Sequence, residues 1–265
     1  MVGVEARQLD DLRWLGLDWD EGPDVGGPRG PYRQSERTAH YEAALETLAR
    51  RELLYHCDCS RAEIARVASA PHPGDEGPRY PGTCRELGLR PRAWKRPPAV
   101  RLRVPAVDVT IDDALQGRVV QDVAAVVGDF VLRRGDGVFA YQLAVVVDDL
   151  AMSVTEVVRG ADLLASAPRQ ALLASLLGGV PPRWAHVPLV VAADGTRLAK
   201  RGGGVTLREQ RAAGIDARTL VDALAALLGL EPRGSAAAMV RAFDRAALAG
   251  RATVRLPVAG PLAGG

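Results

Sequence analysis

All three cysteines of this chain fall inside one short window, as Cys57, Cys59 and Cys84. An odd number of thiols argues against a framework built only from disulfides, and we expect no secretory leader that would supply an oxidising compartment. Zn²⁺ prefers four tetrahedral donors and binds thiolates well, so three cysteines leave one position, which Tyr80, His56 or His72 could fill. Three incidental small hydrophobic residues are the alternative. The clustering favours a metal site, which does not by itself name a function.

The length of 265 residues allows a substantial core, and we expect two or more subdomains. Hydrophobic residues make up 48% and charged residues 25%, which is typical of a soluble globular protein. No apolar run approaches the roughly 20 residues that a membrane-spanning helix needs. These features predict a cytoplasmic protein without a membrane partner.

A net charge of only +2 means that any nucleic-acid surface must be a local patch. Basic residues gather in one segment that also holds Trp94 and a single acid, Glu86: Arg85, Arg90, Arg92, Lys95, Arg96, Arg101 and Arg103. Such a segment can form a phosphate-contacting face or a solvated basic loop, and the sequence favours neither.

Lysine is rare here: of 34 basic residues only Lys95 and Lys200 are lysines. Arginine serves wherever a generic positive charge is needed, so a retained lysine suggests a role for a compact ammonium, such as contact with a phosphate. Lys200 lies in the glycine-rich segment 197–204, which suits polyphosphate binding but would also suit a surface turn.

The hydrophobic pattern predicts helices over 5–17 and 38–54, and short antiparallel strands between 100 and 139. Residues 141–150 are ambiguous between helix and strand. A strand over 154–158, a helix from Pro168 to 178 and a strand over 186–191 form a parallel α/β unit, and helices follow from Asp216. Ligands bind at the carboxyl ends of such strands, so Arg159 and the segment after Val191 should share a crevice.

Several motifs resemble the class I glutamyl-tRNA synthetase family, and within it the short paralogues that lack the large anticodon-binding region. The resemblance covers nearly the whole chain. The segments that carry it are 15–21 (LGLDWDE), 32–37 (YRQSER), 57–59 (CDC), 80–85 (YPGTCR), 141–144 (YQLA), 158–163 (VRGADL) and 168–170 (PRQ).

This resemblance implies a function for the candidate residues. Cys57, Cys59, Tyr80 and Cys84 would bind zinc in an insertion that faces tRNA, and Tyr141 and Arg159 would contact L-glutamate. A degenerate form of the family's KMSKS loop is formed by Arg197, Leu198, Ala199, Lys200 and Arg201. Lys200 matches the second lysine of that loop and is the expected catalytic, ATP-binding cation.

The implied activity is ATP- and Mg²⁺-dependent activation of L-glutamate without tRNA, followed by its transfer to the queuosine of tRNA(Asp). A non-catalytic, zinc-stabilised tRNA-binding protein and a fragment of a glutamate–tRNA ligase are the alternatives. We expect a monomer.

The implied fold is α/β: a class I synthetase Rossmann-like catalytic domain, truncated at its N-terminus, with a zinc-binding insertion and C-terminal helices. Residues 1–55 would be the remnant of its first half, 56–140 the insertion, 141–205 the second half with the KMSKS-like loop, and 206–265 the helical region. The family's HIGH-type ATP-binding signature is not found in these residues, so we expect the true start upstream of Met1. Without that segment the chain is not expected to form the adenylate.

Overall fold

The computed structural model describes residues 3–67, 79–196 and 206–257. The α-helices are α1 (Val4–Trp14), α2 (Thr38–Arg50), α3 (Arg61–Val67), α4 (Val123–Val126), α5 (Tyr141–Ala151), α6 (Ala167–Leu176), α7 (Leu207–Ala212), α8 (Ala217–Leu228) and α9 (Ala236–Ala242). The 3₁₀ helices are η1 (Gln34–Glu36), η2 (Arg85–Leu87), η3 (Ala161–Ser166) and η4 (Arg245–Leu248). None of the helices in the described ranges has the length and apolarity that a membrane crossing requires.

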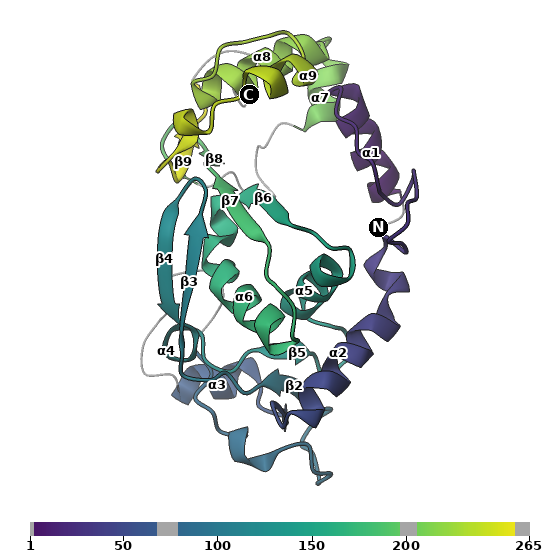
Figure 1. The fold of residues 1–265 in the computed structure, drawn as a ribbon, viewed down its shortest axis with the longest axis vertical. Helices are drawn as coiled ribbons and strands as arrows, with labels where there is room; N and C mark the ends of the chain where they lie inside the picture. Colours follow the sequence, from purple (N-terminus) through teal and green to yellow (C-terminus); the bar gives the residue numbers. More distant parts are fainter. Residues whose placement is uncertain (1–2, 68–78, 197–205, 258–265) are drawn as a thin grey trace.

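The strands form small sheets rather than one large one (Figure 1). They are β1 (Leu54–Cys57), β2 (Ala99–Leu102), β3 (Asp108–Asp113), β4 (Gly117–Asp122), β5 (Val131–Arg133), β6 (Glu156–Gly160), β7 (Arg183–Val187), β8 (Leu189–Val191) and β9 (Thr253–Arg255). The β1–β2–β5 sheet and the β3–β4 hairpin are antiparallel, whereas β6 pairs with β7 and β8 with β9 in parallel.

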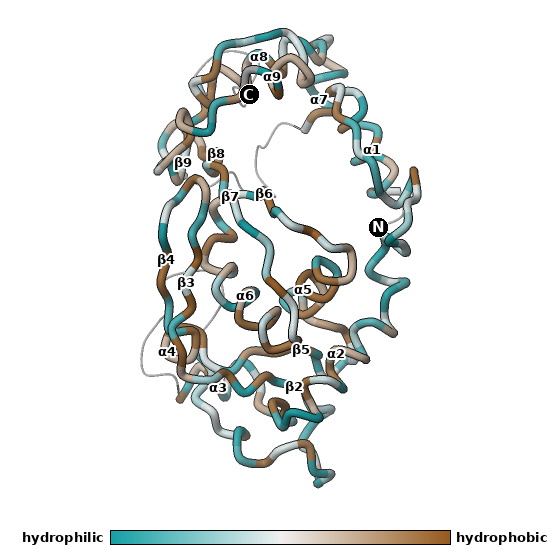
Figure 2. The backbone as a smooth tube through the Cα atoms, viewed as in Figure 1, coloured by the Kyte–Doolittle hydropathy of each residue, from teal (hydrophilic) through white to brown (hydrophobic). Residues whose placement is uncertain are grey.

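The main hydrophobic core lies between α2, α5, α6 and the β1–β2–β5 sheet. Its most deeply buried members are Leu48, Leu102, Val123, Leu132, Leu143 and Leu173. Hydrophobic stretches in α5 and around β5 are visible in Figure 2, while much of α1 is hydrophilic. Residues on both sides of the boundaries expected at 55/56 and 140/141 share this core, and those boundaries stay predictions.

The antiparallel strands between 100 and 139 and the parallel strand–helix–strand unit are confirmed. The ambiguous segment at 141–150 is helix α5. Several bounds were wrong. The helix expected over 5–17 ends at Trp14, and the strand expected over 154–158 is Glu156–Gly160. The helix expected over 38–54 ends at Arg50, because Glu52 adopts a positive φ of 55° and the chain then enters β1. The strand expected over 186–191 is divided at Pro188, which has no amide hydrogen to donate.

A buried carboxylate joins the two main helices of this core. Asp148 in α5 accepts hydrogen bonds from Arg37 Nε at 2.6 Å, the Tyr41 hydroxyl at 3.0 Å and Gln34 Nε2 at 3.0 Å. Arg37 is 1% exposed, and its Nη1 donates to the carbonyl of Pro31 at 2.8 Å. The ion pair therefore fixes the start of α2 against α5.

We predict that Asp148→Asn lowers the free energy of unfolding by about 3–5 kcal/mol, because it leaves the Arg37 charge buried and uncompensated. Urea unfolding measures the loss. The matched control is Glu156→Gln, which removes an exposed pair with Arg183 at 3.9 Å and should change stability by no more than about 0.5 kcal/mol. Equal effects of the two substitutions would contradict this role for Asp148.

Candidate active site and metal centre

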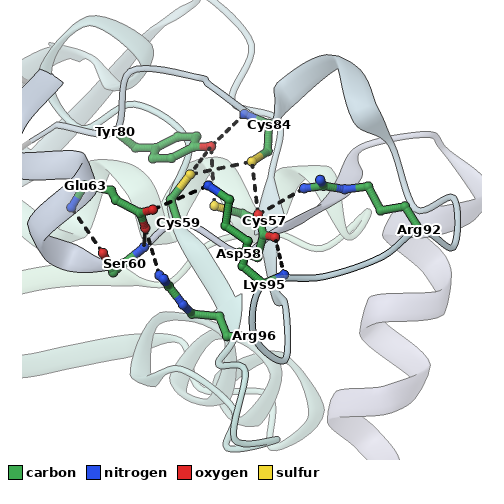
Figure 3. Close-up of polar contacts among 10 residues, drawn as sticks. All are labelled: Cys57, Asp58, Cys59, Ser60, Glu63, Tyr80, Cys84, Arg92, Lys95 and Arg96. Atoms are coloured by element: carbon green, nitrogen blue, oxygen red, sulfur yellow. Dashed lines mark hydrogen bonds and ion pairs between the residues drawn. The ribbon is translucent and has the colours of Figure 1, made fainter.

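The three cysteines converge, as their spacing predicted (Figure 3). Cys57 ends β1, Cys59 follows two residues later, and Cys84 immediately precedes η2. Their Sγ atoms lie within 4.8 Å of one another. Tyr80, 4% exposed, directs its hydroxyl into the same cluster.

The spacing of these donors fits a tetrahedral zinc ion. Zn–S bonds of about 2.3 Å at tetrahedral angles place two sulfurs about 3.8 Å apart, and a sulfur and an oxygen about 3.5 Å apart. Cys59 Sγ and Cys84 Sγ are 3.6 Å apart, and the Tyr80 hydroxyl oxygen lies 3.3 Å from Cys57 Sγ and 3.9 Å from Cys59 Sγ. The three-cysteine cluster can therefore hold zinc.

The side chain of His56 is not part of this cluster. Neighbouring residues of a strand point to opposite faces, and the ring of His56 packs edge-on against Trp94, with 5.3 Å between ring centres. His72 lies outside the described residues. Of the alternatives for a fourth ligand, Tyr80 is the one that the described residues bring to the thiols.

The surroundings of Cys57 and Cys59 shift the pKa values of these two thiols in opposite directions. Burial raises the pKa of Cys57, but the Tyr80 hydroxyl and the Arg101 charge outweigh it, so its pKa is lowered. Burial and the charge of Cys57 raise the pKa of Cys59 to about 12. The guanidinium of Arg101, 3.9 Å from the centre of the Tyr80 ring, is 8% exposed and places a buried positive charge beside the cluster.

Acidic partners hold much of the basic segment. Asp58 accepts from Arg92 Nη2 at 3.0 Å and from the Lys95 amide at 3.1 Å, and Arg96 pairs with Glu63 at 2.8 Å (Figure 3). Arg85 forms an ion pair with Asp129. These contacts fix the segment around the cysteine cluster, so most of its charge is engaged within the protein.

Tyr141 and Arg159, the two predicted glutamate contacts, lie together. Tyr141 begins α5 and is 48% exposed, and Arg159 lies in β6. Burial lowers the pKa of Arg159, and interaction with Tyr141, Asp149 and Asp113 opposes that shift. Asp149 faces the same guanidinium, and burial raises its pKa to about 6 against the attraction of Arg159.

Sequence reasoning missed the residues that hold Arg159. Its Nε lies 3.0 Å from His186 Nε2, and His186 Nδ1 lies 2.5 Å from Asp113 Oδ2. His186 is fully buried, and its residue type and position alone do not mark it as part of a binding site. Its alternation with Trp184 in an apolar strand was an available signal of burial, whereas nothing in the sequence pairs it with Asp113 or Arg159.

The KMSKS-like loop falls outside the described residues: Arg197, Leu198, Ala199, Lys200 and Arg201. Its assignment stays a prediction. The described chain resumes at Thr206, which caps α7 and forms reciprocal hydrogen bonds with Glu209.

The family profile for the catalytic domain of class I tRNA synthetases (E and Q) matches residues 1–243. The chain therefore belongs to this class of synthetase, which confirms the expected fold class. Within the class it belongs to the glutamyl-Q tRNA(Asp) synthetase family. It is 54% identical over 228 residues to the glutamyl-Q tRNA(Asp) synthetase of Nitratidesulfovibrio vulgaris, covering 84% of this chain and 70% of that protein. The enzyme of the same name from Symbiobacterium thermophilum is 51% identical over 232 residues, covering 86% of this chain and 72% of that protein.

Solved structures share this fold. The glutamate–tRNA synthetase of Elizabethkingia anophelis superposes with a TM-score of 0.78 at 23% identity, covering 97% of this chain. A glutamate tRNA ligase from Elizabethkingia meningosepticum gives 0.77 at 24% identity. The chain spans 58% of each of these longer proteins.

We predict that Asp149→Asn stabilises the protein above pH 6. Since burial raises the pKa of Asp149 from 3.8 to about 6, its favourable contribution is complete below about pH 4 and is lost as the pH rises through 6. The asparagine cannot ionise, so the free energy of unfolding of the variant should exceed that of the wild type by on the order of 1–3 kcal/mol near pH 7. Urea unfolding of both proteins from pH 4 to 8 measures the difference, and a pH-independent difference would contradict the prediction.

Proposed function

We infer that this chain activates L-glutamate with ATP and transfers it to the queuosine of tRNA(Asp). The observation that carries this inference is 54% identity across 84% of the chain to an enzyme named for that activity. In the activation step the α-carboxylate of glutamate attacks the α-phosphorus of ATP, which forms glutamyl-adenylate and releases pyrophosphate. AMP leaves when glutamate is transferred to the tRNA.

The surroundings of Arg159 support recognition of an amino acid. A guanidinium offers two parallel donors to a carboxylate, and Asp149 beside it can accept from an ammonium group. The exposed Tyr141 hydroxyl adds a neutral donor and acceptor at the same place. These groups have the charge and hydrogen-bonding character that a zwitterion with a second carboxylate requires.

Phosphate binding is assigned to the loop that contains Lys200, on the strength of the family resemblance. A compact ammonium stabilises the negative charge that develops on the departing pyrophosphate. Mg²⁺ would accompany ATP. The loop follows the parallel strand β8 in the chain. Nucleotides bind at the carboxyl ends of parallel strands in α/β folds, so this is a suitable place for ATP.

A cavity links the cysteine cluster to Tyr141 and supports the tRNA as the second substrate. It has a volume of about 730 Å³, and its walls include Cys59, Arg61, Arg101, Arg134 and Tyr141. None of the described residues that line it is acidic, although Arg134 reaches Asp136 at 2.5 Å outside the lining. Such a basic lining suits contact with the phosphates of a bound nucleic acid.

Zinc has a structural role in this proposal. Cys57, Cys59, Cys84 and Tyr80 would hold the ion, and the ion would hold together β1, the segment before η2 and the basic residues that Asp58 anchors. Four protein ligands leave no open position, as is usual for structural zinc.

A glutamate–tRNA ligase is the second candidate function, because the ligase of Heliobacterium modesticaldum is 41% identical over 87% of this chain. The chain covers only 47% of that ligase, whereas it covers 70% of the glutamyl-Q enzyme of N. vulgaris at higher identity. These figures favour the modification of tRNA(Asp). We place the enzyme in the cytoplasm, where its tRNA substrate resides, and retain the expectation of a monomer.

Glutamate-dependent exchange of pyrophosphate into ATP tests the activation step. In the extended protein described below we predict exchange without tRNA. Arg159→Lys in that protein should lose about 10–100-fold in kcat/KM for glutamate, because it keeps the charge but loses the paired donors. The control is Arg183→Lys, whose side chain is 78% exposed. The assay uses the 265-residue chain and the same chain extended through the coding sequence upstream of Met1. No exchange by either protein would overturn the proposal.

Metal analysis tests the zinc site. We predict about one zinc per chain, lost in Cys84→Ser, and a decrease in zinc affinity of at least about 10-fold in Tyr80→Phe. His56→Gln is the matched control and should retain zinc, because His56 lies outside the cluster. A zinc-free protein with intact thiols would contradict the ligand assignment.

A further inference from the structure

Two buried polar side chains and a half-buried arginine connect the β3–β4 hairpin to the candidate glutamate site. Asp113 ends β3, His186 lies in β7 and Arg159 lies in β6, directly opposite His186 in the parallel register. The side chains of Asp113 and His186 are fully buried. Oδ2 of Asp113 is 2.5 Å from His186 Nδ1, and His186 Nε2 is 3.0 Å from Arg159 Nε.

Asp113 is held independently of the histidine ring. Its Oδ1 accepts from the amides of Leu115 at 3.0 Å and Gln116 at 2.8 Å, and its carboxylate also accepts from the His186 amide at 3.2 Å. Burial raises the pKa of Asp113, but the hydrogen bonds from His186 and these amides outweigh it and lower its pKa. The carboxylate is therefore a fixed, ionised acceptor.

These contacts determine the tautomer of His186. Arginine carries donors only, so His186 Nε2 must accept the hydrogen of Arg159 Nε and cannot carry a proton. The single ring proton then lies on Nδ1, where it is donated to Asp113. Asp113 thus favours the neutral tautomer of His186 in which Nε2 can accept a hydrogen bond from Arg159 Nε.

Arg159 depends on this contact because its strand has limited support. Among the described residues β6 pairs only with β7, and Val158 next to Arg159 is 65% exposed. The guanidinium also donates through Nη2 to the carbonyl of Leu163 at 3.3 Å. With Nε and one Nη2 hydrogen engaged in this way, the remaining donors are presented toward Tyr141 and Asp149.

We propose that Asp113 and His186 are positioning residues for substrate binding: the Asp113–His186 pair supplies a fixed acceptor that orients the Arg159 guanidinium toward the carboxylate of glutamate. This inference rests on the proposed function, in which Arg159 binds glutamate. A rotated guanidinium would keep its charge but lose its paired geometry, so the effect falls on glutamate affinity rather than on ATP.

Two isosteric substitutions separate the two sides of His186. Gln places its amide oxygen near the position of Nε2 and keeps an acceptor for Arg159, whereas Asn places its amide near Nδ1 and keeps a donor for Asp113. We predict that His186→Asn raises KM for glutamate in pyrophosphate exchange by about 10-fold or more, as expected for a lost hydrogen bond to a charged group. His186→Gln should stay within about threefold of the wild type, and KM for ATP should change little in either variant.

The control variant is His40→Gln, at an exposed position in α2. If His186→Asn binds glutamate as well as His186→Gln, the positioning role is overturned. If the wild type itself shows no exchange, the proposed function fails instead, which is a distinguishable result.

A second measurement keeps the inference testable if the variants do not fold. The chain has four histidines, so ¹⁵N NMR of labelled wild-type protein can resolve the ring nitrogens of His186. The His186 signal is identified by slow exchange of its buried ring proton with solvent, or by its loss in His186→Gln. We expect protonated Nδ1 and unprotonated Nε2 at pH 7. A proton on Nε2, or on both nitrogens, would overturn the inference.

Discussion

The contact of α2 with α5 is the constraint on which the candidate site depends. Asp148 on the inner side of α5 receives Arg37, Tyr41 and Gln34, which come from a segment more than 100 positions earlier in the chain. The cost of burying the Arg37 charge is offset only if Asp148 stays in place. Because Tyr141 and Asp149 belong to the same helix, the packing that fixes α5 also fixes two of the groups around Arg159.

A second set of constraints surrounds the cysteine cluster. Asp58 lies between two of the cysteines and binds the segment that contains Arg92 and Lys95 (Figure 3). Arg101 adds a buried positive charge beside three groups that become anionic when they bind a metal. One cavity is lined both by Cys59 of the cysteine cluster and by Tyr141 of the proposed glutamate site.

Residue spacing and hydrophobic pattern predicted those features of the structure that depend on residues close together in the sequence. The cysteine spacing predicted that the three thiols converge, and β-branched runs predicted the antiparallel strands. Local patterns failed where a distant residue decides the outcome. Nothing local marks His186 as part of the site, because its partners, Asp113 and Arg159, lie on other strands and are brought together only by the tertiary fold. The end of α2 was likewise set by the backbone of Glu52 and by pairing of β1 with β2, neither of which follows from hydrophobic periodicity.

The central claim is that this chain modifies tRNA(Asp) at queuosine rather than charging a tRNA at its 3′ end. The most direct test is transfer of labelled glutamate to tRNA(Asp) that contains queuosine, beside the same tRNA without queuosine and tRNA(Glu). The account predicts label only in the queuosine-containing tRNA(Asp). Label in tRNA(Glu), or equal label in tRNA(Asp) with and without queuosine, would contradict it.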